Sequence, residues 1–135
     1  MRVVLDTNVL LVSIDRNSPF RPIFDALLRE RFTLVVSTSI LLEYEEIFAQ
    51  RNGPVVAQNI LEALGNLRNV SRREVRYQWR MPFADPDDQK FVGAYVAGNA
   101  DCLISNDRHF GGLSATGFPN ARVLTAEAFL KYFGA

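Results

Sequence analysis

The chain alternates between short apolar runs and longer segments in which apolar residues recur every three or four positions. The short runs predict buried strands, and the longer segments predict amphipathic helices. We expect strands at residues 2–6, 32–36, 101–105 and 122–124, and an extended segment at 75–79, where apolar and polar residues alternate. We expect helices at residues 8–14, from 18 onward, from 37 to about 51, across 56–67, from 85 to about 98, and after 125.

Strands that alternate with helices predict an α/β fold whose parallel sheet is covered by helices on both faces. The length of 135 residues fits one domain spanning residues 1–135. Ser18 followed by Pro19 predicts a helix start, with serine as N-cap and proline at the first helical position. Open parallel sheets place their functional sites at the carboxyl ends of the strands, so acidic residues there are the first candidates.

Composition and charge exclude some classes of protein. The chain has 15 basic and 15 acidic residues, which argues against a uniformly basic nucleic-acid binder but leaves local patches open. Its single cysteine, Cys102, lies in an apolar run, so we expect a core residue and no internal disulfide, as in a reducing cytoplasm. We expect no membrane span and no signal peptide, because no apolar stretch has the required length or layout.

Asp6 and Asp107 follow two predicted strands at their carboxyl ends, which places both at the same edge of the sheet. An ordinary structural role is open for each: Asp6 could cap the next helix, and Asp107 could be a turn residue. Asp101 opens the second of these strands and therefore lies at the opposite edge. We exclude Asp101 from the candidate site.

Asp88 and Glu43 are the other two candidates. Asp88 shares a helical stripe with the apolar residues 91, 92 and 95, and an inward-facing acid is costly unless a cation compensates it. The alternative is that Asp88 only complements the dipole of its helix. Glu43 lies early in a helix that follows a strand, but the pattern alone favours a solvated glutamate there.

Carboxylates gathered within a few ångströms repel one another, by about 4 kcal/mol per pair at 4 Å and an effective dielectric constant near 20. Such a group either stays partly protonated or holds a divalent cation. Oxygen ligands favour Mg²⁺ or Mn²⁺ over zinc. A site of this kind can activate water and offset charge on a phosphodiester.

Four segments of the chain, taken together, resemble the motifs of the PIN-domain ribonucleases. They are residues 6–10 (DTNVL), 37–43 (STSILLE), 85–91 (DPDDQKF) and 100–107 (ADCLISND). Their order and spacing agree with the family over nearly the whole chain. The sequence is most similar to the VapC-like toxin components of bacterial and archaeal toxin–antitoxin pairs.

This resemblance implies a three-layer α/β/α sandwich and RNA cleavage that depends on Mg²⁺ or Mn²⁺. It also implies neutralisation by a cognate antitoxin protein, a homodimer in many members, and a cytoplasmic location. The metal ligands that it implies are Asp6, Glu43, Asp88 and Asp107. The supporting polar groups that it implies are Thr7, Asn8 and Ser105, with Ser37 a weaker case.

One position departs from the family pattern. His109 stands where many relatives carry a further acid, so a fifth acid has no counterpart here, and we expect this histidine to be a surface loop residue.

Five arginines gather within residues 68–80 and could contact RNA phosphates or an acidic antitoxin segment. They are Arg68 and the four RNA-binding candidates Arg72, Arg73, Arg76 and Arg80. Tyr77 and Trp79 lie between them, and their alternation favours packing inward over stacking on bases.

Three other functions stay open at this point. A PIN nuclease could process RNA without being a toxin, and a catalytically silent PIN fold could act only as a protein-binding module. A haloacid-dehalogenase-type phosphatase also begins with an acid at the end of its first strand. That family needs a second acid two residues later, where this chain has Asn8.

Overall fold

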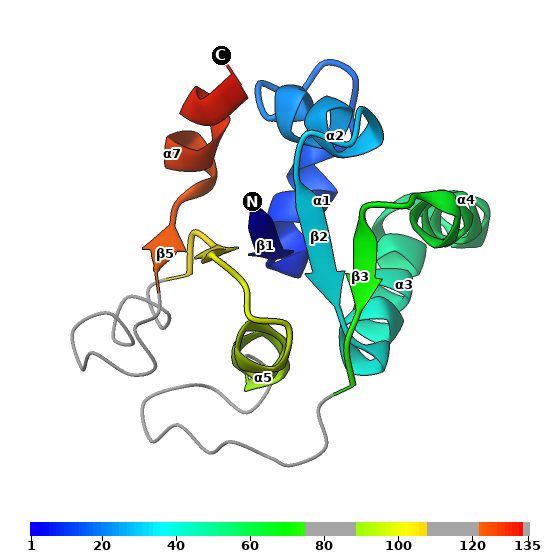
Figure 1. Ribbon diagram of the computed structural model, residues 1–135. Coiled ribbons are helices and arrows are strands. Elements are labelled where there is room, and N and C mark those ends of the chain that lie inside the picture. Colours follow the sequence, from blue (N-terminus) through cyan, green and yellow to red (C-terminus); the bar gives the residue numbers. More distant parts are fainter. Residues whose placement is uncertain (75–88, 108–121, 134–135) are drawn as a thin grey trace.

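The structure is a computed structural model that describes residues 1–74, 89–107 and 122–133 (Figure 1). The strands are β1 (Arg2–Leu5), β2 (Thr33–Val36), β3 (Val70–Arg72), β4 (Cys102–Ile104) and β5 (Val123–Leu124). The helices are α1 (Thr7–Ser13), α2 (Arg21–Leu28), α3 (Thr38–Asn52), α4 (Pro54–Asn66), α5 (Gln89–Ala97), α7 (Ala126–Leu130) and the short 3₁₀ helix η2 (Lys131–Phe133).

The strands form one parallel sheet in the order β3-β2-β1-β4-β5. At its centre, Val3 of β1 pairs with Cys102 of β4, and Leu5 pairs with Ile104. Because every neighbouring pair is parallel, all the strands end at the same edge. The residues that follow β1 and β4 therefore lie beside each other, as the sequence predicted.

The central strands are apolar on both faces because helices cover both. Val3, Val4 and Leu5 are fully buried although successive side chains point to opposite faces, and the same is true of residues 34–36 in β2. Helix α5 packs against β1, β2 and β4, whereas α1 packs against α3, and α3 lies along α4 (Figure 1). The predicted α/β/α sandwich is confirmed.

Two predictions about the elements need correction. Helix α2 starts at Arg21 rather than at Ser18, because the Ser18 hydroxyl accepts from the backbone N–H of Phe20 and closes a separate turn before the helix. Strand β3 was missed, since its three residues, one of them a serine, carry no apolar run. The predicted extended segment at 75–79 and the predicted helix start at residue 85 lie outside the described residues.

Two other predictions are confirmed. The helix expected after residue 125 is α7, and its N-cap is Thr125, whose hydroxyl accepts from the backbone N–H of Ala128 at 3.1 Å. Cys102 is buried in the core, and burial raises the pKa of its thiol to about 11. None of the described helices is both long enough and apolar enough to cross a membrane.

Candidate carboxylate site at the sheet edge

Asp6 is a buried acid at the point where β1 passes into α1. Its backbone N–H donates to the carbonyl of Ile104 at 3.0 Å, which continues the pairing of β1 with β4 by one residue. Its side chain, only 8% exposed as a residue, accepts a hydrogen bond of 2.7 Å from the Ser105 hydroxyl. Asp6 stands at the N-cap position of α1. The bond to Ser105 shows that its carboxylate also faces the neighbouring strand end.

Burial raises the pKa of Asp6 above its ordinary value, and the negative charges of Asp107 and Glu43 raise it further. The hydrogen bond from Ser105 opposes this shift because it stabilises the ionised form. The charges of Asp107 and Glu43 therefore disfavour ionisation of Asp6. A cation placed among the three would stabilise the ionised carboxylate.

Ser105 links Asp6 to Asp107. The Ser105 side chain is buried, and its hydroxyl donates to Asp6 while accepting from the backbone N–H of Asp107 at 3.0 Å. The next residue, Asn106, accepts from the backbone N–H of Ala126 at 3.0 Å through its side chain, which ties the loop after β4 to the start of α7. These bonds hold the half-buried Asp107 at the edge where Asp6 lies.

Glu43 reaches the site from the second turn of α3. Its Oε2 accepts from the Thr7 hydroxyl, and its Oε1 accepts from the Lys90 ammonium at 2.8 Å. The side chain is 21% exposed, so Glu43 is held between α1 and α5. The alternative of a freely solvated helix glutamate is wrong.

Sequence reasoning missed two residues of this site. Lys90 lies two positions after Asp88, and nothing in the spacing of basic residues indicated that it would pair with Glu43. Tyr44 is fully buried behind the site, and its hydroxyl donates to the carbonyl of Leu5 at 2.6 Å. Burial raises the pKa of Tyr44 well above its ordinary value, and the charges of Asp6 and Glu43 add to that shift.

Several candidates from the sequence lie elsewhere or outside the described residues. Ser37 is buried and caps α3, because its hydroxyl accepts from the backbone N–H of Ile40 at 3.2 Å. Asn8 is exposed at the start of α1. Arg72 pairs with Glu74 at 3.1 Å. The structure does not describe Asp88, Arg76, Arg80 or His109.

The donor chemistry of the site fits a hard divalent cation. Asp6, Glu43 and Asp107 offer only carboxylate oxygens, the ligand type that Mg²⁺ and Mn²⁺ favour. Within the described ranges no three acidic, histidine or cysteine side chains are already grouped closely enough to hold an ion together. Glu43 is instead engaged by Thr7 and Lys90.

The family model described as PIN domain matches residues 2–109, so the chain belongs to the PIN domain family. This membership removes the support for a haloacid-dehalogenase-type phosphatase. No curated protein matches the chain.

Two solved structures share the fold. One is VapBC2 from Rickettsia felis bound to a DNA fragment from their promoter, with a TM-score of 0.62 and 15% identity over 93% of this chain and 98% of that one. The other is DNA-bound VapBC from Salmonella typhimurium, with a TM-score of 0.57 and 16% identity over the same shares. At 15% and 16% identity, the similarity to these two structures shows a shared fold and nothing further.

Proposed function

We propose that this protein is a single-domain endoribonuclease that depends on Mg²⁺ or Mn²⁺ and cleaves RNA phosphodiester bonds. The observation that carries the proposal is the buried Asp6 carboxylate, which Ser105 bonds at 2.7 Å and links to Asp107, and whose pKa is raised by burial and by the charges of Asp107 and Glu43. A protein that only needed a stable sheet edge would gain nothing from this repulsion. A divalent cation, when bound, activates water and offsets negative charge on a phosphodiester.

Asp6, Glu43 and Asp107 are the described residues that would hold the cation, and we propose Asp88 as the fourth ligand. Ser105 orients Asp6, and Thr7 orients Glu43, through the hydrogen bonds described above. The hydroxyls of Ser105 and Thr7 thus fix the orientations of Asp6 and Glu43, which come from different parts of the chain. Mutation of residues that hydrogen-bond to metal ligands in this way commonly lowers metal affinity by roughly 10–100-fold.

We further propose that the protein is the toxin of a toxin–antitoxin pair, acts in the cytoplasm and forms a homodimer. The resemblance of its motifs to VapC-like toxins supports this, as does the shared fold with the two VapBC structures. Arg72 and Arg73, at the end of β3, are proposed contacts for RNA phosphates, together with Arg76 and Arg80.

The test is RNA cleavage by the purified chain with Mn²⁺ present, comparing wild type, Asp6→Asn and Asp101→Asn. Asp101 is the matched control, because it is an exposed acid before β4 whose Oδ2 accepts from the backbone N–H of Arg2 at 2.7 Å, at the opposite edge. We expect cleavage by wild type and Asp101→Asn and none by Asp6→Asn.

Cleavage by Asp6→Asn at the wild-type rate would contradict the proposal. An absence of cleavage by all three proteins over a broad RNA panel would instead favour a silent PIN domain that only binds protein. Cleavage without growth arrest when the chain is expressed alone would favour an RNA-processing enzyme over a toxin.

A further inference from the structure

Lys90 of α5 brings a positive charge into direct contact with the proposed metal site. Its ammonium lies 2.8 Å from Oε1 of Glu43, and both side chains are largely shielded from water, at 25% and 21% exposure. Partial burial matters here, because an ion pair on the open surface contributes little. The pair joins α5 to α3, and its two residues are 47 positions apart in the chain.

Lys90 lies on α5, and its ammonium donates to a carboxylate oxygen of Glu43 on another helix. Glu43 therefore supplies the interaction that stabilises this charge. In return, the ammonium offsets part of the negative charge that Glu43 shares with Asp6 and Asp107.

Glu43 has both carboxylate oxygens engaged, one by Thr7 and one by Lys90. A divalent cation that approaches Glu43 meets an ammonium already bonded to one of those oxygens. The two cations also repel each other. Binding of one must therefore weaken binding of the other.

We propose that Lys90 is a positioning residue that acts as the resident counter-ion of the acidic site, and that a divalent cation must displace it from Glu43. This inference rests on the proposed metal-dependent function and deepens it. Lys90 holds Glu43 between α1 and α5 in the metal-free protein and lowers the affinity of the site for the metal. It thereby sets the metal concentration at which the nuclease becomes active.

The test is a calorimetric titration of Mn²⁺ into the full chain after treatment with a chelator. The variants are Lys90→Met, which removes the charge and keeps the length, and Lys90→Arg, which keeps the charge. Lys131→Met is the matched control, because Lys131 is an exposed lysine of η2. We expect Lys90→Met to tighten Mn²⁺ binding by roughly tenfold, while Lys90→Arg and Lys131→Met stay within about twofold of wild type.

A second readout needs no metal. Lys90→Met should lower the Tm of the metal-free protein more than Lys131→Met does, because Glu43 loses the cation that offsets its charge. Adding Glu43→Gln to Lys90→Met should recover much of that loss, since the unpaired charge is removed. Equal Tm values for Lys90→Met and Lys131→Met would contradict a counter-ion role.

The outcomes separate this inference from the proposed function. If wild type binds Mn²⁺ and Lys90→Met binds it equally or more weakly, the counter-ion role is wrong and the metal-dependent nuclease stands. If wild type binds no Mn²⁺ at millimolar concentration, both fail.

Discussion

Ser105 and Asp6 are 99 positions apart in the chain, and their side chains are joined by a buried hydrogen bond of 2.7 Å. The bond exists because β1 and β4 are adjacent and parallel, so that their ends coincide at one edge. It fixes the orientation of the most buried acid of the site. The Ser105 hydroxyl also accepts a hydrogen bond from the backbone N–H of Asp107.

Replacing Ser105 with alanine should lower both stability and activity. The Asp6 carboxylate would lose its donor and the Asp107 N–H its acceptor, which costs about 1–3 kcal/mol of unfolding free energy for buried groups. Urea denaturation at neutral pH measures this change. Ser71→Ala is the control, since Ser71 is half-buried in edge strand β3 and accepts a longer bond, of 3.2 Å, from Arg2. Equal losses in the two variants would contradict a special role for Ser105.

The stability of the metal-free protein should depend on the ionisation of Asp6. Its pKa is raised in the folded state above the ordinary value of 3.8, so the unfolded chain releases this proton first as the pH rises. The contribution of Asp6 to the unfolding free energy is therefore present below 3.8 and is lost as the pH rises through the folded-state pKa.

The measurement is the unfolding free energy of wild type and Asp6→Asn as a function of pH, with a chelator present. Asparagine cannot ionise, so the variant should gain stability relative to wild type across this pH window. Parallel curves for the two proteins would show that the pKa of Asp6 is not raised.

Gly98 follows α5 and allows it to pack closely on β2. A Cβ added there would lie 2.4 Å from Cγ1 of Val35 and 2.9 Å from the carbonyl oxygen of Ala94. Gly98→Ala should therefore destabilise the protein by about 1–3 kcal/mol, because a tightly packed core does not accept an extra methyl group.

Gly65 of α4 has room for a side chain, so its substitution should have the opposite effect on stability. A Cβ there meets nothing within 4 Å, so Gly65→Ala should stabilise the protein by about 0.5–1 kcal/mol through helix propensity alone. Thermal or urea denaturation of both variants checks the pair. A Gly98→Ala protein as stable as wild type would mean that α5 packs less closely than described.

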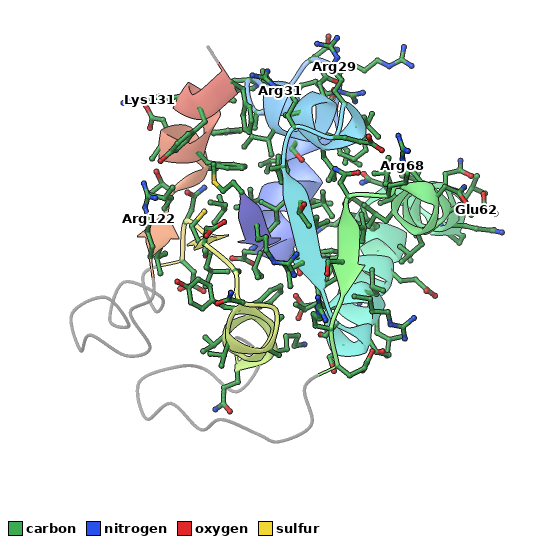
Figure 2. All side chains as sticks on the ribbon, in the orientation of Figure 1. Arg29, Arg31, Glu62, Arg68, Arg122 and Lys131 are labelled. Atoms are coloured by element: carbon green, nitrogen blue, oxygen red, sulfur yellow. The ribbon has the colours of Figure 1, made fainter. Side chains whose placement is uncertain are left out.

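The arginines at the end of β3 should bind RNA mainly through charge. Reversing Arg72 and Arg73 to glutamate should weaken RNA affinity more at low salt than at high salt, because phosphate contacts release counterions. The pair Arg29 and Arg31, near α2 at the opposite end of β2, is the control, and its arginines are labelled in Figure 2. Unchanged affinity at both salt concentrations would exclude Arg72 and Arg73 from RNA binding.

The sequence predicted the sheet and two of its acids for a simple physical reason. Apolar runs identify buried strands, and parallel strands bring their ends together, so the nearness of Asp6 and Asp107 followed from the pattern. The resemblance to the PIN family, and not the residue pattern, suggested Glu43 for the site, and neither of them indicated its bonds to Thr7 and Lys90. They depend on how α1, α3 and α5 pack against one another, which periodicity within one helix does not encode.

Other features were hidden for local reasons. Strand β3 has a mixed pattern of three residues and is stabilised by pairing with β2 rather than by its own apolar run. Ser18 has the chemistry of a helix cap, but it uses that chemistry in a turn. Lys90 carried no signal, because a single lysine in a helix is common on protein surfaces.

The central claim is that acids from distant parts of the chain bind one divalent cation, and Mn²⁺ titration of wild type, Asp6→Asn and Asp101→Asn tests it most directly. We expect wild type and Asp101→Asn to bind Mn²⁺ with equal affinity. We expect Asp6→Asn to lose at least roughly tenfold in affinity, since even outer-shell changes at metal sites cost that much. Equal Mn²⁺ affinity in all three proteins would contradict the account.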